Sequence, residues 1–328
     1  MTERFPFPPC PDGWFQVAYS RDVGPGDVVS MSYFGEQLIC FRDSTGTAHV
    51  LDAYCPHQGA DIGVGGEVEG DCVKCPFHGW LFDGNGRNVE IPYAKSVNRA
   101  ARLRAWPVDE RAGCIFVWHS TSGSPPAWEL PQVPEFDDDS FEWHVPEDAR
   151  WQIRTHVQEI YENTVDVAHF ATVHKVANFG SIDVCEDGPM FRAVAEVSFV
   201  TPRGPVAGAV DSELWGLGLD VVRHRGLGRS CTLLTATPID GERVDVRYTF
   251  LVLRDSDTGE MSRLGIGMMR DFLNQISQDI PIWENKVYRT KPQLARGEGA
   301  VIAFRKWAQR SYPEAAPAVT QNEKASSL

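Results

Sequence analysis

Short apolar runs separated by turn residues dominate the first 120 residues of the chain. Runs at 27–31, 37–41, 48–53 and 114–118 have the length of β-strands, and Gly, Ser, Thr or Asp residues lie between them. This alternation of short apolar runs and turn signals is typical of β-structure. We therefore expect a β-rich N-terminal third.

The rest of the chain mixes helical and strand patterns. The Asp240-Gly241 pair separates two apolar segments and predicts an antiparallel hairpin, and Pro281 predicts a kink in a long helix. Together the two parts predict an α+β protein. The predicted elements are helices at 154–170, 264–288 and 301–310 and strands at 190–200 and 230–237.

A stretch rich in Ser, Gly and Pro at 120–126 has the composition of a linker. It predicts one domain at 1–122 and a second at 123–314. The small and polar residues at 315–328 predict a disordered tail.

Charge and composition narrow the function classes. The 328 residues carry 31 basic and 45 acidic side chains, a formal charge of −14, which argues against nucleic acid because phosphate binding needs a basic face. No apolar run approaches the ~20 residues that span a bilayer, and the start of the chain lacks the apolar stretch of a signal peptide. We expect a cytoplasmic protein without a membrane span.

The eight cysteines are expected to be reduced thiols, and three of them fall within 55–75. Two loops there each offer one thiolate and one imidazole, flanked by Gly and Pro residues that allow tight turns. The four candidate ligands are Cys55, His57, Cys75 and His78. Cys72 is interpreted as a buried strand residue rather than a ligand.

The mixed composition of each loop decides between metals. Structural zinc sites usually place like ligands in the same loop, whereas a Rieske [2Fe–2S] cluster has two Cys on one iron and two His on the other. Two mixed loops that meet across a cluster give that division directly, so we expect a Rieske cluster and a role in one-electron transfer.

A second group of polar residues lies near the predicted helix at 154–170. Glu162, Asp166 and His169 share one helical face with Asn163 beside it. His174 follows His169 by five residues, about 140° around an ideal helix, so both can bind one ion only if the helix ends or bends between them. Two His and one carboxylate form the ligand set of non-haem Fe(II) oxygenases.

The carboxylate ligand is expected on the later long helix. Asp279 is the preferred candidate because it precedes Pro281, which frees the local backbone. Asp271 is the second choice and Glu284 the third. Phe179, Trp215 and Leu217 are candidates for the mouth of a substrate pocket, and the Gly-rich stretch 204–218 for a mobile access loop.

The sequence resembles the Rieske non-haem iron oxygenases over most of its length. The matching motifs are Cys55-x-His57-x17-Cys75-x2-His78 and Asn163-x2-Asp166-x2-His169-x4-His174, in that order. The resemblance implies a β-rich Rieske domain followed by a helix-grip catalytic domain, an antiparallel sheet with helices enclosing an apolar pocket. It implies a mononuclear Fe(II) besides the cluster.

The resemblance also implies a role for Asp166. In these enzymes an Asp at this position bridges a cluster His of one subunit to an iron His of the next, which here would join His78 to His169. Such transfer between subunits implies a ring, most simply a homotrimer. Asn163 and Asp166 are therefore the candidate catalytic residues, beside the iron ligands His169, His174 and Asp279.

The late part of the chain is most similar to the steroid-active members, the 3-ketosteroid 9α-hydroxylase oxygenases and the cholesterol 7-desaturases. In them the Asp of the first matching stretch is the carboxylate ligand, which favours Asp279. The chain is shorter than expected of these relatives, and Pro313-Glu314 replaces an aromatic-rich ending. The matching stretches are Asp279-x3-Trp283-x-Asn285-Lys286, Lys291-Pro292-x-Leu294 and Ile302-x2-Phe304-Arg305-x-Trp307.

The activity implied is O2-dependent hydroxylation or desaturation of a polycyclic apolar, steroid-like substrate. Electrons would come from a separate NAD(P)H-dependent flavin and iron–sulfur reductase or a ferredoxin, since Gly63-Val64-Gly65-Gly66 opens no helix and is not a nucleotide-binding loop. The alternative reaction is aromatic-ring dihydroxylation or O- or N-demethylation of a smaller substrate. Two alternative functions lie outside the oxygenases: an electron carrier and a zinc-stabilised lipid-binding module. The number of iron atoms per chain distinguishes an oxygenase from each of them.

Overall fold

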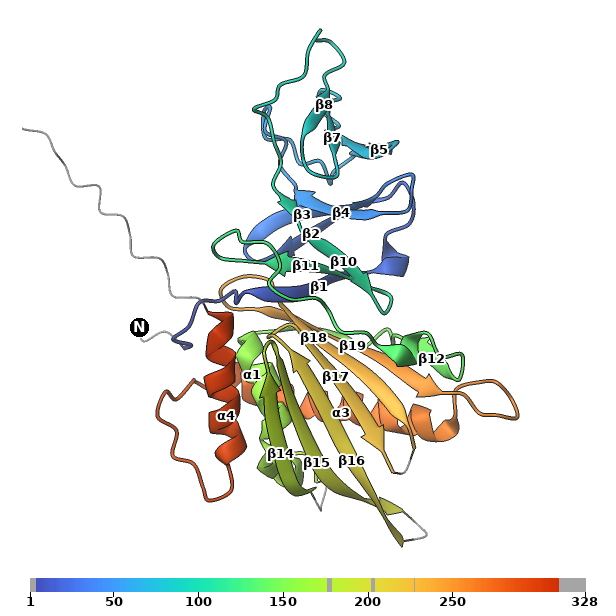
Figure 1. Ribbon diagram of the computed structural model, residues 1–328, viewed down its shortest axis with the longest axis vertical. Coiled ribbons are helices and arrows are strands. Elements are labelled where there is room, and N and C mark those ends of the chain that lie inside the picture. Colours follow the sequence, from blue (N-terminus) through green and yellow to red (C-terminus); the bar gives the residue numbers. More distant parts are fainter. Residues whose placement is uncertain (1–3, 176–178, 202–203, 227, 313–328) are drawn as a thin grey trace, which may run out of the picture.

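The computed structural model describes residues 4–175, 179–201, 204–226 and 228–312 (Figure 1). The predicted tail at 315–328 lies outside the described residues. No helix in the described ranges combines the length and the apolar composition needed to cross a bilayer.

Three small antiparallel sheets form the N-terminal domain, in the upper part of Figure 1. Their strand orders are β1-β11-β10, β2-β3-β4-β9 and β5-β6-β7-β8. The third sheet lies at the tip farthest from the rest of the molecule. The strands are β1 (Gly13–Tyr19), β2 (Val28–Tyr33), β3 (Glu36–Arg42), β4 (Ala48–Asp52), β5 (Glu67–Glu69), β6 (Cys72–Lys74), β7 (Leu81–Asp83), β8 (Asn88–Glu90), β9 (Ala105–Trp106), β10 (Val108–Arg111) and β11 (Cys114–His119).

One large antiparallel sheet forms the centre of the second domain. Its strand order is β12-β19-β18-β17-β16-β15-β14, and β13 also pairs with β19. The predicted hairpin at Asp240-Gly241 is confirmed, because β18 and β19 pair antiparallel around it. The strands are β12 (Phe141–His144), β13 (Arg150–Ile153), β14 (Phe179–Asp187), β15 (Met190–Thr201), β16 (Gly204–Trp215), β17 (Leu219–Arg225), β18 (Ser230–Pro238) and β19 (Val244–Leu253).

Four α-helices accompany this sheet within the described residues: α1 (Val157–Glu162), α2 (Val167–Thr172), α3 (Arg263–Asn285) and α4 (Gly299–Ala308). The long helix α3 begins at the Ser262 cap, whose hydroxyl accepts a hydrogen bond from Gly265 N–H. It runs through Pro281 to Asn285. Trp283 of α3 and Phe304 of α4 are buried in the same core as β18 and β19, so the α+β prediction is confirmed.

Strands β18 and β19 are buried on both faces. Along β19, Val246, Tyr248 and Phe250 belong to the core shared with the helices. Leu251, which points the other way because side chains alternate along a strand, packs with Trp14 and other residues of the N-terminal domain. The sheet therefore separates the N-terminal domain from helix α3.

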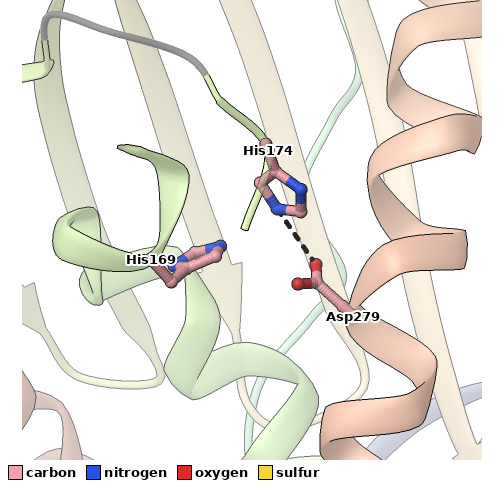
Figure 2. Close-up of side chains that lie close together, drawn as sticks. All are labelled: His169, His174 and Asp279. Atoms are coloured by element: carbon pink, nitrogen blue, oxygen red, sulfur yellow. Dashed lines mark ion pairs between the residues drawn. The ribbon is translucent and has the colours of Figure 1, made fainter. Parts of the chain in front are cut away.

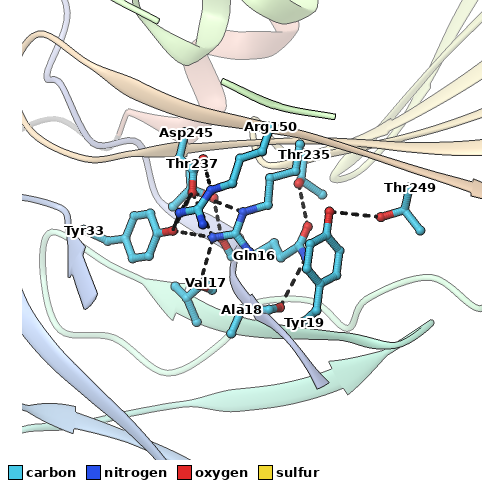
Figure 3. Close-up of polar contacts among 11 residues, drawn as sticks. Gln16, Val17, Ala18, Tyr19, Tyr33, Arg150, Thr235, Thr237, Asp245 and Thr249 are labelled. Atoms are coloured by element: carbon cyan, nitrogen blue, oxygen red, sulfur yellow. Dashed lines mark hydrogen bonds and ion pairs between the residues drawn. The ribbon is translucent and has the colours of Figure 1, made fainter. Parts of the chain in front are cut away.

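A largely buried polar cluster joins the N-terminal domain to the face of the large sheet that is turned toward it (Figure 3). Tyr33 donates a hydrogen bond to the Asp245 carboxylate at 2.5 Å, and Arg247 donates to Asp245 at 2.8 Å and to the backbone oxygen of Val17 at 3.1 Å. Arg150 adds a second guanidinium at 2.9 Å from Asp245. The buried Asp245 carboxylate is thus paired with the buried Arg247 and the half-exposed Arg150, and pairing is the condition for burying a charge.

Two threonines of β18 extend this interface. Thr235 donates to the Gln16 side chain and Thr237 to the Gln16 backbone oxygen, both at 2.6 Å. Because these bonds fix β1 to β18, they hold the N-terminal domain in one orientation on the sheet.

The interface predicts a large cost for Asp245→Asn. The substitution leaves the buried Arg247 guanidinium without its carboxylate, and removing one partner of a buried pair costs about 3–5 kcal/mol. Urea unfolding followed by circular dichroism measures the change. Asp240→Asn is the matched control, because the Asp240–Arg243 pair lies at the surface and should contribute about 0–1 kcal/mol. Equal losses in both variants would contradict the role of the cluster.

Candidate metal centres and substrate pocket

The two Cys/His loops lie at the tip of the N-terminal domain and have the same backbone pattern. Cys55 N–H donates to Ala60 O and Cys75 N–H to Trp80 O, each five residues ahead. Gly59 and Gly79 then donate to the oxygens of Cys55 and Cys75. Both glycines have φ near +70°, which favours glycine, so the tight turns expected from the sequence are confirmed.

The four candidate ligands of these loops converge. The rings of His57 and His78 lie 4.5 Å apart between centroids, and the buried thiols of Cys55 and Cys75 interact by a hydrogen bond. Burial, together with the Cys75 thiol, raises the pKa of Cys55 to about 11. The two thiols thus contact each other and the two imidazole rings contact each other, and two Cys with two His is the donor set of a Rieske cluster.

Trp80 holds the His57 ring in place. The two rings are stacked with centroids 4.4 Å apart, and the Trp80 indole N–H donates to the Tyr93 hydroxyl at 2.8 Å. The sequence interpretation of Cys72 was partly right: this residue is in strand β6 but is only half-buried.

The second group of candidate ligands is also brought together (Figure 2). One ligand atom from each of His169, His174 and Asp279 lies within 4.8 Å of the others. His174 Nε2 is 3.3 Å from a carboxylate oxygen of Asp279. His169 is on α2, His174 follows the end of that helix, and Asp279 is on α3.

The helix break that the spacing required is present. The predicted helix at 154–170 is divided into α1, a 3-10 turn at Asn163–Val165 and α2, which ends at Thr172. The chain therefore leaves the helix before His174, and both imidazoles can face one point. Glu162 is not part of this group, because its carboxylate pairs with Arg305 at 2.7 Å.

An oxygen atom lies beside the Nδ1 atom of each imidazole. His174 Nδ1 lies 2.9 Å from the amide oxygen of Gln278, and His169 Nδ1 contacts the backbone oxygen of Asp166. If each Nδ1 carries the proton, each Nε2 presents a lone pair, as a metal requires. The sequence interpretation missed Gln278, although its place beside Asp279 was a signal.

The surroundings of Asp279 favour a bound cation. Burial raises the pKa of the Asp279 carboxyl to about 6, against the opposing effects of His174 and an Asn163 hydrogen bond. Burial also lowers the pKa of His169. A site that disfavours a lone carboxylate and an imidazolium fits a divalent metal held by two neutral imidazoles and one carboxylate.

The other candidate carboxylates lie outside this group. Asp271 is exposed two turns earlier on α3 and accepts a hydrogen bond from Gln275. Glu284 accepts from the backbone N–H of Arg154. Of the three carboxylates considered, the geometry therefore favours Asp279.

A cavity of about 450 Å³ adjoins the His–His–Asp group. It lies between the sheet and α3, and its walls are mainly apolar. The volume is in the range of small-molecule sites. Representative wall residues are Ala195, Val210, Val222, Leu234, Met268 and Ile276.

The sequence-based candidates for the pocket mouth were wrong where they can be assessed. Leu217 is fully buried in the apolar core, and Trp215 packs beside Trp128; neither lines the cavity. The stretch 204–218 is largely strand β16 rather than a loop. The Phe179 side chain lies outside the described side chains.

Comparisons with known proteins agree with this architecture. Residues 13–107 match the Rieske [2Fe-2S] domain, and residues 117–312 match the 3-ketosteroid 9alpha-hydroxylase C-terminal domain. The 3-ketosteroid-9-alpha-monooxygenase oxygenase component of Mycolicibacterium smegmatis is 31% identical, over 93% of this chain and 83% of the relative. Cholesterol 7-desaturase of Drosophila melanogaster is also 31% identical, over 93% and 76%.

A solved structure of dicamba monooxygenase bound to dicamba has the same fold. Its TM-score is 0.74 at 16% identity, with 92% of this chain and 96% of that chain covered. The chain therefore belongs to the Rieske non-haem iron oxygenases, in the family defined by the 3-ketosteroid 9alpha-hydroxylase C-terminal domain. It is an oxidoreductase with a Rieske [2Fe-2S] domain.

Iron analysis tests the two groups of ligands separately. His169→Ala is expected to lower the iron content from about three to about two atoms per chain while the visible spectrum of the cluster is unchanged. Cys75→Ala should instead abolish that spectrum. A His169→Ala protein with unchanged iron content and activity would contradict the assignment.

Acid should release the mononuclear metal. A carboxyl with its pKa raised to about 6 is protonated as the pH falls through that value, and the proton then competes with the metal. We expect the apparent affinity for Fe(II) or Co(II) to be lower at about pH 5 than at about pH 7.5. The Asp271→Asn variant is the control and should show the same pH dependence. An equal metal affinity of the wild type at both pH values would contradict the prediction.

Proposed function

We propose that this chain uses O2 to hydroxylate or desaturate an apolar, polycyclic, steroid-like substrate with electrons from a separate reductase. The observation that carries the proposal is the position of His169, His174 and Asp279 in the wall of a mainly apolar cavity. The names of the two relatives support it, since one is a steroid monooxygenase component and the other a sterol desaturase.

We propose that His169, His174 and Asp279 hold a mononuclear iron, and that Cys55, His57, Cys75 and His78 hold the Rieske cluster. When bound, the cluster supplies one-electron transfer and the iron supplies activation of O2. Gln278 and the backbone oxygen of Asp166 orient the imidazoles. Asn163 orients the carboxylate, and the apolar walls exclude water from the reacting C–H group.

Recognition of a small aromatic acid fits the cavity less well. Arg263 is the arginine in the described cavity wall, but it is sixteen residues before Asp279 on α3. At 1.5 Å per residue this places it about 24 Å along the helix from the metal ligand. A carboxylate bound there would leave a one-ring substrate far from the reaction site.

We further propose that electrons reach the iron site from a neighbouring subunit of a homotrimer. The large sheet of the second domain lies between the N-terminal domain and α3. The two Cys/His loops are at the tip of the N-terminal domain that is farthest from this sheet (Figure 1). Four apolar side chains near these loops are more than half exposed, as expected of a contact surface: Tyr54, Val64, Phe77 and Tyr93.

Asp166 is the proposed link between subunits. It lies three residues before His169, at the start of α2, and its carboxylate makes no hydrogen bond to the described residues. It can therefore accept one from the partner subunit's His78. The reductase, a flavin and iron–sulfur protein or a ferredoxin, would dock from outside; one relative is itself named an oxygenase component.

Asp166→Asn tests the link. We expect turnover to fall about 10- to 100-fold with the iron content and cluster spectrum intact, because the amide is a weaker partner for an imidazole N–H. Sedimentation velocity of the native protein checks for a trimer. Unimpaired turnover, or a protein that is monomeric and fully active, would contradict transfer between subunits.

The reaction can be tested without the natural reductase. The chemically reduced holoenzyme is mixed with O2 in the presence of one class of substrate at a time. The classes are four-ring steroids, aromatic acids, and N- or O-methylated aromatics. Mass spectrometry should detect a steroid that has gained one oxygen atom or lost two hydrogens. Oxidation of the aromatics alone would replace the proposal by the alternative activity.

A further inference from the structure

A buried carboxyl group lies in the wall of the cavity. Asp220 is on β17, on the same strand face as Val222 and His224. It is only 1% exposed, and among the described residues its Oδ1 atom has no hydrogen-bond partner. Burying a carboxyl group costs free energy, so its place in a mainly apolar cavity requires an explanation.

A hydroxyl group connects Asp220 to the segment that carries the metal-site residues. Thr164 Oγ1 donates a hydrogen bond to Asp220 Oδ2 at 3.2 Å. Thr164 belongs to the 3-10 turn that separates α1 from α2, and it also lines the cavity. Its neighbour in this turn, Asn163, hydrogen-bonds to the carboxyl group of Asp279. Asp220 and Thr164 thus form an acid–alcohol pair beside the His–His–Asp group.

The surroundings of Asp220 allow its carboxyl group to exchange a proton near neutral pH. Burial raises the pKa of Asp220 to about 7, against the opposing effects of the Thr164 and Ser212 hydroxyls. A group with a pKa near the working pH can both give and regain a proton. The ionisable groups that act on it from α1, β16, β18 and β19 are acids: Tyr161, Asp211, Glu213, Cys231 and Tyr248.

Three other titratable groups of the cavity wall are less suited to proton transfer. Asp271 is exposed to solvent. Burial lowers the pKa of His224 to about 4, so that its ring, whose Nδ1 atom is 3.3 Å from the Ser230 hydroxyl, is neutral at pH 7. Burial raises the pKa of Tyr248 well above its ordinary value. Of these buried groups, Asp220 is therefore the one that changes its protonation near pH 7.

The proposed reaction consumes protons inside a cavity whose apolar walls exclude water. Hydroxylation takes up one O2, two electrons and two protons, and it yields the alcohol and one water molecule. Desaturation takes up the same electrons and protons and yields the alkene and two water molecules. The electrons come from the reductase that the proposed function requires, whereas the protons have to pass through groups of the chain.

We infer that Asp220 stores one of these protons and passes it through the Thr164 hydroxyl to an oxygen atom that leaves as water. Asp220 Oδ2–H gives its proton to Thr164 Oγ1 while the former Thr164 O–H bond breaks and that proton moves into the cavity. The Asp220 carboxylate regains a proton from solvent after the product leaves. The inference rests on the proposed function and adds a proton path to it.

Infrared spectroscopy of the holoenzyme tests the stored proton without turnover. The wild type should show the C=O stretch of a protonated buried carboxyl group at about pH 6, and this band should be lost at about pH 8.5. Asp220→Asn should lack the band at both pH values. Asp109→Asn is the matched control and should keep it, because Asp109 pairs with Arg111 in the N-terminal domain. A wild type without the band, or an Asp220→Asn protein that retains it, would overturn the inference.

Single-turnover rates of the chemically reduced holoenzyme test the transfer. With a four-ring steroid that the wild type oxidises, Asp220→Asn and Thr164→Val should form product about 100-fold more slowly. Iron content and cluster spectrum should be intact, because asparagine still accepts the hydrogen bond from Thr164. The wild-type rate should fall as the pH rises through about 7, since the acid is then deprotonated, and Asp220→Asn should lose this dependence. Thr164→Ser keeps a hydroxyl and should keep most of the rate.

The remaining outcomes distinguish this inference from the proposed function. If the wild type oxidises the steroid and Thr164→Val is equally fast, the proton path fails and the proposed function stands. Loss of iron from Asp220→Asn would show that the residue only supports the fold, and would also overturn the path. If the wild type oxidises none of the steroids, the proposed function fails and the proton path fails with it.

Discussion

The burial of β18 and β19 on both faces is the constraint on which the rest of the molecule depends. Alternate side chains of these strands belong to two different environments: Tyr248 and Leu234 face the cavity and helices, whereas Asp245 and Thr235 bond to the N-terminal domain. A shift of one residue in register would exchange the two sets and place a charged cluster in the substrate cavity. The same strands therefore fix both the orientation of the domains and the chemistry of the pocket.

This arrangement places the two groups of candidate metal ligands on opposite sides of one sheet. The N-terminal domain packs on one face and α3, which carries Asp279, on the other. The cluster loops then point away from the cavity (Figure 1). If the two domains keep this geometry, the shortest route for an electron from the Cys/His loops to the His–His–Asp group leads to a second copy of the chain. This is the physical basis for the proposed ring.

The cavity combines an apolar wall with a few buried polar groups, each at a cost in desolvation. Asp279 and its two histidines recover that cost when a cation binds, because the charge is then compensated. His224 avoids it by remaining neutral, and Ser230 satisfies one of its ring nitrogens.

The sequence by itself determined the features that depend on short-range spacing. The loops around Cys55 and Cys75 and the break between His169 and His174 could be predicted, because ligands and turn residues lie within a few positions of one another. The sequence could only rank Asp279 above Asp271 and Glu284 as the carboxylate candidate, because the distance from Asp279 to His174 depends on how α3 packs. Asp220 and Gln278 were missed, and Trp215 was misplaced, because the side on which a strand or helix residue faces is decided by the neighbouring strands and helices. The tertiary structure alone decided what lines the cavity, since alternation along a strand gives two faces and only packing shows which of them faces the cavity.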